Sequence, residues 1–189
     1  MSRQITAWPP VETELPKRHP EAPPAGTELG PHYVKCFGCG DQVNNGLRLH
    51  TTLGDGLVAH TKFTVTEGHQ GAPGLAHGGA LSAAFDEALG TLNVLTRQPA
   101  VTGKLETEFL RPVPVGSTLY ITARIDGVAG RKIYNSAQGR LDGNDGPIAV
   151  RARALFVVVG LDHFTKYGAF EDLASMGSRG VTQDYEVNP

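Results

Sequence analysis

Residues 71–95 read GAPGLAHGGALSAAFDEALGTLNVL, and this stretch decides the fold. Its first part is rich in Gly, which favours a loop. Ala and Leu dominate the next 17 or so residues, long enough for several helical turns. Because Gly78 and Gly79 begin the helix, their backbone N–H groups have no partner within it, and they lie at the positive end of the helix dipole. The stretch therefore predicts a helix whose N-terminus can serve as an oxyanion hole.

Asp86 is the acidic residue that stands out in this helix. No Lys or Arg lies within one turn of it, so no pairing along the helix neutralises its charge. Desolvation would raise its pKa, which suits a general base or a nucleophile. The alternative is that Asp86 and Glu87 form a narrow solvated stripe on the helix.

The spacing of these groups has a consequence for assembly. Gly78 and Asp86 lie about 12 Å apart along one helix axis, because each residue of an α-helix rises 1.5 Å. They cannot act on the same carbonyl carbon within one chain. If both are catalytic, two antiparallel central helices must meet across a twofold axis. The sequence then predicts a homodimer, with a tetramer left open.

Strand-like runs lie on both sides of the helix. Two runs precede the helix, and Gly54-Asp55-Gly56 between them predicts a hairpin. Four further runs follow the helix. An antiparallel sheet of about six strands wrapped round one helix would explain why that helix is apolar nearly all round. The predicted fold class is α+β, with strands at residues 46–53, 57–66, 100–111, 118–127, 132–141 and 148–159.

Length and composition limit the function classes. The chain has 189 residues, 40% of them hydrophobic, enough for one sizeable core. Its net charge of -2 gives no basic field for nucleic acid, so no nucleic-acid partner is expected. We expect a cytoplasmic protein without membrane insertion, because the sequence shows neither a long apolar run nor a signal-peptide pattern.

The chain divides into three predicted segments. Residues 1–31 hold seven of the thirteen prolines and predict an arm that is extended or disordered, in which Trp8 is either solvated or docked on a neighbouring subunit. Residues 32–160 form the folded domain. In the tail, residues 161–189, aromatic and aliphatic side chains recur every third position behind Asp162, which predicts a short amphipathic helix capped by that residue: Phe164, Tyr167, Phe170 and Leu173.

The two cysteines, Cys36 and Cys39, form a single C-x-x-C pair. A structural zinc site needs four ligands and there is no second such pair, so only the fold or a partner chain could recruit His32, His50 or His60. Two reduced thiols in a tight Gly-containing turn are the favoured interpretation. We therefore expect no metal and no cofactor.

Several motifs resemble those of the PaaI-type hotdog thioesterases. They are HGGA at residues 77–80 with an Asp nine positions after the His, CFGCG at 36–40, NGLRL at 45–49 and GHQGAPG at 68–74. The resemblance covers residues 36–159 and implies the hotdog fold. It implies Asp86 in preference to Glu87 as the catalytic acid, and it places Thr102 where relatives carry a Thr or Ser that positions the attacking water.

The resemblance also implies roles for substrate-binding residues. Gln70 would donate a second hydrogen bond to the thioester oxygen, and Arg131 and Lys132 would hold coenzyme A phosphates, unless they are a solvated hairpin tip. His77 is expected to position the loop by hydrogen bonding, because Asp86 already supplies the base. Phe85 is expected to help set the length of the acyl tunnel.

The expected function is hydrolysis of an acyl-CoA thioester to free acid and CoA in lipid metabolism. Asp86 of one subunit would act as base or nucleophile, facing the Gly78 and Gly79 amides of the other. The alternatives are a non-catalytic acyl-CoA-binding hotdog module and a hotdog enoyl-CoA hydratase. The His-Gly-Gly to Asp spacing does not resemble the hydratase motif.

Overall fold

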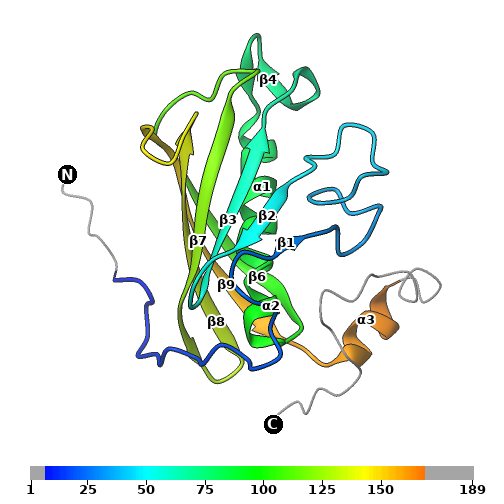
Figure 1. Cartoon of the computed structure of the whole chain (residues 1–189), viewed down its shortest axis with the longest axis vertical. Coiled ribbons are helices and arrows are strands. Elements are labelled where there is room, and N and C mark those ends of the chain that lie inside the picture. Colours follow the sequence, from blue (N-terminus) through cyan, green and yellow to red (C-terminus); the bar gives the residue numbers. More distant parts are fainter. Residues whose placement is uncertain (1–6, 169–189) are drawn as a thin grey trace.

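The computed structural model describes residues 7–168 and shows a strongly curved antiparallel sheet (Figure 1). Its strand order is β1-β2-β3-β7-β8-β9-β6, and every neighbouring pair is antiparallel. The strands are β1 (Glu28–Leu29), β2 (His50–Leu53), β3 (Val58–Thr64), β6 (Ala100–Phe109), β7 (Thr118–Ala129), β8 (Lys132–Leu141) and β9 (Ile148–Val158). Two short strands, β4 (Gln70–Ala72) and β5 (Leu75–Ala76), form a separate hairpin before the central helix.

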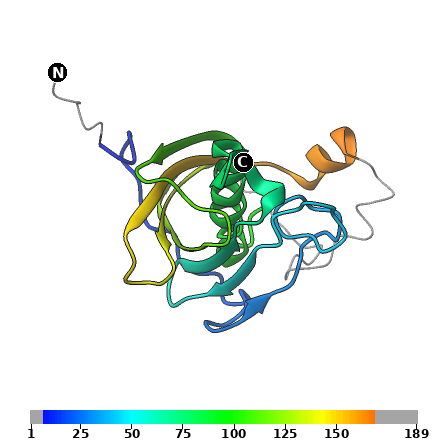
Figure 2. The same ribbon diagram turned by 90° about the horizontal axis from the view of Figure 1, so that it is seen from above.

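The sheet wraps around helix α1 (Gly78–Gly90), as the view from above shows (Figure 2). The predicted helix was continuous to Leu95, but it ends at Gly90 and a short helix, α2 (Asn93–Thr96), follows. At Gly90 the helix passes close to the sheet, because a Cβ there would lie 3.4 Å from the ring of Phe156.

Most of the predicted strands are present within a residue or two of their expected limits. The exception is the run at residues 46–53, of which only β2 (His50–Leu53) pairs as a strand. Arg48 has a φ of 51°, in the left-handed region, which interrupts extended structure. The seventh strand, β1, comes from the end of the arm, where Leu29 pairs with Thr51.

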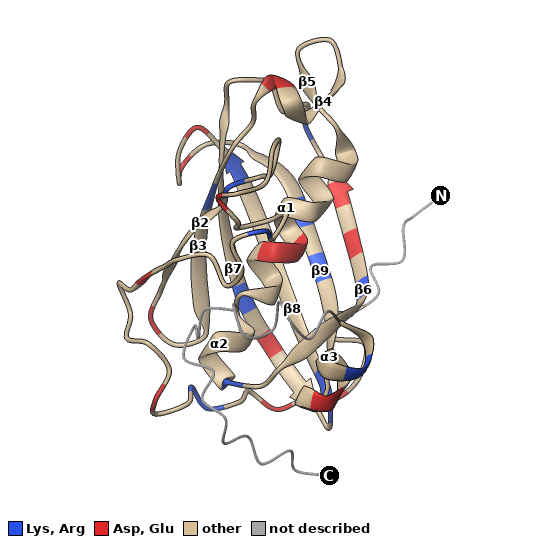
Figure 3. Ribbon diagram, turned by 90° about the vertical axis from the view of Figure 1, so that its right-hand side faces the viewer, with Lys and Arg blue, Asp and Glu red and all other residues tan. Residues whose placement is uncertain are grey.

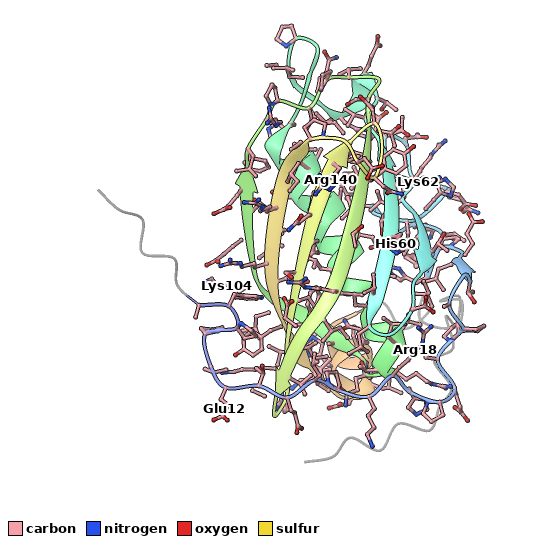
Figure 4. The ribbon with its side chains drawn as sticks, turned by 60° about the vertical axis from the view of Figure 1, so that its left-hand side comes forward. Glu12, Arg18, His60, Lys62, Lys104 and Arg140 are labelled. Atoms are coloured by element: carbon pink, nitrogen blue, oxygen red, sulfur yellow. The ribbon has the colours of Figure 1, made fainter. Side chains whose placement is uncertain are left out.

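The described part of the arm, residues 7–31, lies extended against the body of its own chain. Trp8 donates from Nε1 to Asp126 Oδ2 at 3.0 Å and packs edge-on against Tyr134, so it is neither solvated nor dependent on another subunit. Further along, Arg18 donates to the carbonyl oxygens of Gly54 and Gly56, at the β2–β3 hairpin (Figure 4). These contacts hold the described part of the arm against its own chain.

Helix α3 (Leu161–Tyr167) follows the last strand. Its N-cap is Gly160 and not Asp162, which lies in the first turn, so the predicted cap is wrong by two residues. The predicted continuation through Phe170 and Leu173 lies outside the described residues. No helix in the described range is both long and apolar enough to span a bilayer.

Candidate active site

Helix α1 and strand β6 bring Asp86 and Thr102 together. Thr102 Oγ1 donates a hydrogen bond to Asp86 Oδ1 at 2.8 Å. Burial raises the pKa of Asp86 above its ordinary value, while the hydrogen bond from Thr102 acts in the opposite direction. The result is a half-buried carboxylate whose orientation is held from the neighbouring strand. Such a group can accept a proton from a bound water.

A bulge in β6 directs Thr102 toward the helix. Leu105 and Thr107 face inward, since Leu105 packs on the core and Thr107 hydrogen bonds to Ser82 of α1 at 3.2 Å. Regular alternation would then turn Thr102 outward. The register with β9 shifts between Thr102 and Lys104, so Gly103 is an extra residue and the alternation reverses there. The hydroxyl of Thr102 reaches Asp86 because of that reversal.

His77 caps the N-terminus of α1. Its Nδ1 accepts a hydrogen bond from the Gly79 amide at 2.8 Å, and its own amide donates to the carbonyl of His69. The expected pair of oxyanion donors is therefore reduced to one in this structure, because His77 occupies the Gly79 amide. Among the described residues none accepts a hydrogen bond from the Gly78 amide, which remains available to a substrate oxygen.

Gln70 braces the hairpin before the helix. Its Oε1 accepts from the Gly74 amide at 2.8 Å and its Nε2 donates to the Glu67 carbonyl at 3.3 Å. The Gln70 side-chain amide, expected to donate to the thioester oxygen, thus holds the β4–β5 turn in this structure.

Phe85 is a core residue of this chain. It is completely buried, and a Cβ at Gly139 of β8 would come within 2.7 Å of its ring. That Phe85 helps to set the length of an acyl tunnel stays a prediction. One residue along a helix turns by 100°, so Phe85 points into the sheet while Asp86 points toward the edge strand β6.

Glu87, the other acid of α1, contacts the cysteine loop. Cys36 Sγ lies 3.5 Å from Glu87 Oε2, and His32 Nδ1 lies 3.6 Å from Glu87 Oε1. Hydrogen bonds with Cys36 and Glu87 raise the pKa of His32 to about 9, while those from Cys39 and His32 lower the pKa of Cys36 to about 4. The acidic pair appears as a red band in the middle of α1 (Figure 3).

Four side chains in this region could hold a metal: His32, Cys36, Cys39 and Glu87. Sequence reasoning missed Glu87 as a member of the group because it lies 48 residues beyond Cys39 in the chain. The sequence did contain one signal that another element approaches this loop closely: Gly38 and Gly40, the glycines that flank Cys39.

Arg131 and Lys132 lie at the β7–β8 hairpin. This is the end of the sheet that also holds Thr102, since Lys132 pairs with Val157 and Thr102 with Phe156. The Arg131 guanidinium is partly engaged, donating from Nε to the Val158 carbonyl at 3.0 Å. Lys132 is exposed.

A cavity of about 900 Å³ lies on the outer face of the sheet, the face turned away from α1. His60 and Arg140 line it from β3 and β8 (Figure 4). Asp86 and Thr102 do not line this cavity, so it is separate from the candidate active site.

Residues 73–144, which include Asp86, Thr102 and the His77 cap, match the family model described as the Thioesterase superfamily. The match covers less than half of the chain. The chain is also similar to the acyl-coenzyme A thioesterase THEM4 of Bos taurus, with 41% identity over 71 residues, 38% of this chain and 29% of that protein. It thus spans less than a third of that relative's length.

Two solved structures share the fold of this chain. One is the E. coli PaaI protein from the phenylacetic acid degradation operon, with a TM-score of 0.55 and 22% identity over 60% of this chain and 81% of that one. The other is a Streptococcus mutans protein solved bound to acetyl CoA, with a TM-score of 0.51 and 20% identity over 55% and 82% of the two chains. These likenesses confirm the predicted hotdog fold.

Proposed function

We propose that the protein hydrolyses an acyl-CoA thioester to a free acid and CoA. The observation that carries the proposal is the Asp86–Thr102 hydrogen bond, which holds a partly desolvated carboxylate inside a segment that matches the Thioesterase superfamily model. The similarity to an acyl-coenzyme A thioesterase over residues that make up 38% of the chain supports the same substrate class.

In this mechanism the thioester carbonyl oxygen accepts a hydrogen bond from the Gly78 amide, at the positive end of α1. Asp86 takes a proton from water, whose oxygen attacks the carbonyl carbon. The carbon–sulfur bond then breaks, and Asp86 returns the proton to the departing CoA thiolate. Direct attack by the Asp86 carboxylate, followed by hydrolysis of the anhydride, is the alternative that the same geometry allows.

The site would be completed by a second copy of the chain. Gly78 and Asp86 lie about 12 Å apart along α1, too far to act on one carbonyl group. Among the described strands β6 ends the strand order of the sheet, so one of its edges has no neighbouring strand there. Phe109 at the end of β6 and Leu110 after it are about half exposed. Pairing of two β6 edges about a twofold axis would place the two α1 helices antiparallel.

The CoA moiety would reach the β7–β8 hairpin. Lys132 is exposed there, next to Arg131 and at the same end of the sheet as Thr102. If this hairpin binds the phosphates of CoA, the acyl end of the substrate can point toward Asp86. The acetyl CoA bound in the Streptococcus mutans structure supports a CoA ligand for this fold.

The reaction is tested by measuring free thiol released from short, long and aromatic acyl-CoAs by the full chain. We expect turnover of at least one class and tight selectivity among them. If no acyl-CoA of the panel released thiol while acyl-CoA binding was retained, hydrolysis would be overturned in favour of a binding module.

The shared site is tested by mixing two inactive variants, Asp86→Asn and Gly78→Pro. Proline suits the first helical position, because its missing N–H is one that the helix does not use, and the residue before it, His77, already has the extended conformation that Pro requires. Mixed dimers would carry one intact site, so we expect recovery of about a quarter of wild-type turnover after subunit exchange. No recovery, with exchange shown by mass spectrometry, would place the site within one chain.

A further inference from the structure

Four side chains with metal-binding atoms converge beside the central helix. His32, Cys36 and Cys39 come from the loop before β2, and Glu87 comes from α1. One ligand atom of each lies within 4.8 Å of those of the other three. Two thiols, an imidazole and a carboxylate form a donor set that suits Zn²⁺.

Three of the separations between these atoms are close to those of a single tetrahedral centre. Cys39 Sγ lies 3.0 Å from His32 Nδ1, Cys36 Sγ lies 3.5 Å from Glu87 Oε2, and His32 Nδ1 lies 3.6 Å from Glu87 Oε1. Metal–ligand bonds of about 2.0 to 2.3 Å at the tetrahedral angle put neighbouring ligand atoms about 3.3 to 3.8 Å apart. Shifts of about 1 Å or less would complete the coordination, because no two of the four ligand atoms are more than 4.8 Å apart.

Two glycines shape the loop so that the ligands can meet. A Cβ at Gly38 would lie 2.7 Å from Glu87 Oε2 and 2.9 Å from Glu87 Cβ, and a Cβ at Gly40 would lie 2.5 Å from the Cys36 carbonyl oxygen. The Gly40 amide donates to that carbonyl at 2.8 Å and closes the turn around the two thiols. The turn is therefore built for close approach, both within the loop and to the helix.

The burial of the cluster argues for a cation. Cys39 is 7% exposed and the side chain of Glu87 is 14% exposed, so a carboxylate and a thiol share a largely dry site. Grouped anionic ligands are costly to bury unless a positive charge offsets them. His32, whose side chain is 34% exposed, supplies at most one such charge, whereas a divalent ion would offset two.

We propose that His32, Cys36, Cys39 and Glu87 bind one Zn²⁺ ion that fastens the loop before β2 to the central helix. All four coordination positions are filled by the protein, which is typical of a structural site. Its ligand Glu87 follows Asp86 directly in the sequence, but the ion would not take part in the hydrolysis. This proposal stands independently of the hydrolase proposal.

The test is the metal content of the full chain, purified under reducing conditions without chelator. We expect about one equivalent of zinc per chain by mass spectrometry of the acid-digested protein, as for other closed zinc sites. Cys39→Ser and His32→Ala should lower zinc affinity at least about tenfold. His50→Ala is the matched control, because its ring is exposed and lies near Glu28, away from the cluster.

A second measurement does not depend on the variants folding. Co²⁺ added to metal-free wild-type protein should give the intense visible bands of a tetrahedral site and the thiolate charge-transfer absorption of two cysteines, and Zn²⁺ should displace both. The proposal would be overturned by wild-type protein that takes up neither Zn²⁺ nor Co²⁺ while both thiols stay equally reactive with and without metal. A Cys36–Cys39 disulfide in protein kept in cytosol-like glutathione buffer would overturn it as well.

Discussion

Asp86 and Glu87 are consecutive residues of one helix, yet they lie in different surroundings. Asp86 faces β6, where it accepts a hydrogen bond from the Thr102 hydroxyl at 2.8 Å. Glu87 faces the loop before β2, where its oxygens lie near Cys36 Sγ and His32 Nδ1. The helix turns by 100° between them, so two side chains of nearly the same chemistry point into separate environments.

The difference teaches how one helix can supply a reactive and a structural carboxylate side by side. Thr102 holds one oxygen of Asp86, and the structure describes no further hydrogen bond to that carboxylate, which leaves it able to take a proton. Glu87 is surrounded by three side chains that can share a metal ion with it. If both proposals hold, changing either acid should affect one property and largely spare the other.

Exchanging each acid for its amide gives the largest expected effect. Asp86→Asn should lower thiol release at least about a hundredfold while zinc content stays at the wild-type level, because removing a general base costs that much and the metal site is untouched. Glu87→Gln is the matched control: it should weaken zinc binding and lower turnover far less. Equal loss of turnover in both variants would contradict the division of roles.

A methyl group at position 38 should affect the contact between Glu87 and the cysteine loop and leave the surroundings of Asp86 unchanged. Gly38→Ala places a Cβ against Glu87 down to its Cβ atom, so a rotation of the carboxylate end cannot relieve the contact. We expect a loss of about 2 kcal/mol in the free energy of unfolding, typical of overpacking, together with weaker zinc binding. The measurement is urea denaturation with and without zinc.

Gly30→Ala provides the control for that experiment, because a Cβ at Gly30 would meet no atom within 4 Å. An equal loss in the free energy of unfolding in both variants would mean that the Gly38→Ala effect does not come from the close approach of Glu87 to the loop.

Removing the Thr102 hydroxyl should have the smallest effect. Thr102→Val deletes one hydrogen bond to a charged group, worth about 1.5 kcal/mol, so kcat should fall about tenfold with KM little changed. Thr107→Val removes a hydrogen bond between the same two elements without touching Asp86, and it should leave kcat near normal. Thr102→Ser keeps the hydroxyl and should restore most of the rate; failure to do so would remove Thr102 from the site.

Much of the fold was predictable because periodic patterns report local structure. The alternation of apolar residues around Phe63 gave β3 within two residues of its observed ends, and Gly54-Asp55-Gly56 marked the β2–β3 hairpin. The missed features are those that local pattern does not encode. Arg48 takes a left-handed conformation inside a run that reads as a strand, and the central helix stops at Gly90 although the apolar pattern continues to Leu95.

By itself the sequence determined the long helix, the strands that surround it, and the positions of Asp86 and of the His-Gly-Gly cap, because hydrophobic period and turn residues act over short distances along the chain. Only the tertiary structure decided which groups meet. It turned Thr102 inward through the bulge at Gly103, buried Phe85 in the core, and brought Glu87 to the cysteine loop. Each of these depends on side-chain directions and close contacts between elements that are distant in the chain, which no short stretch of sequence contains.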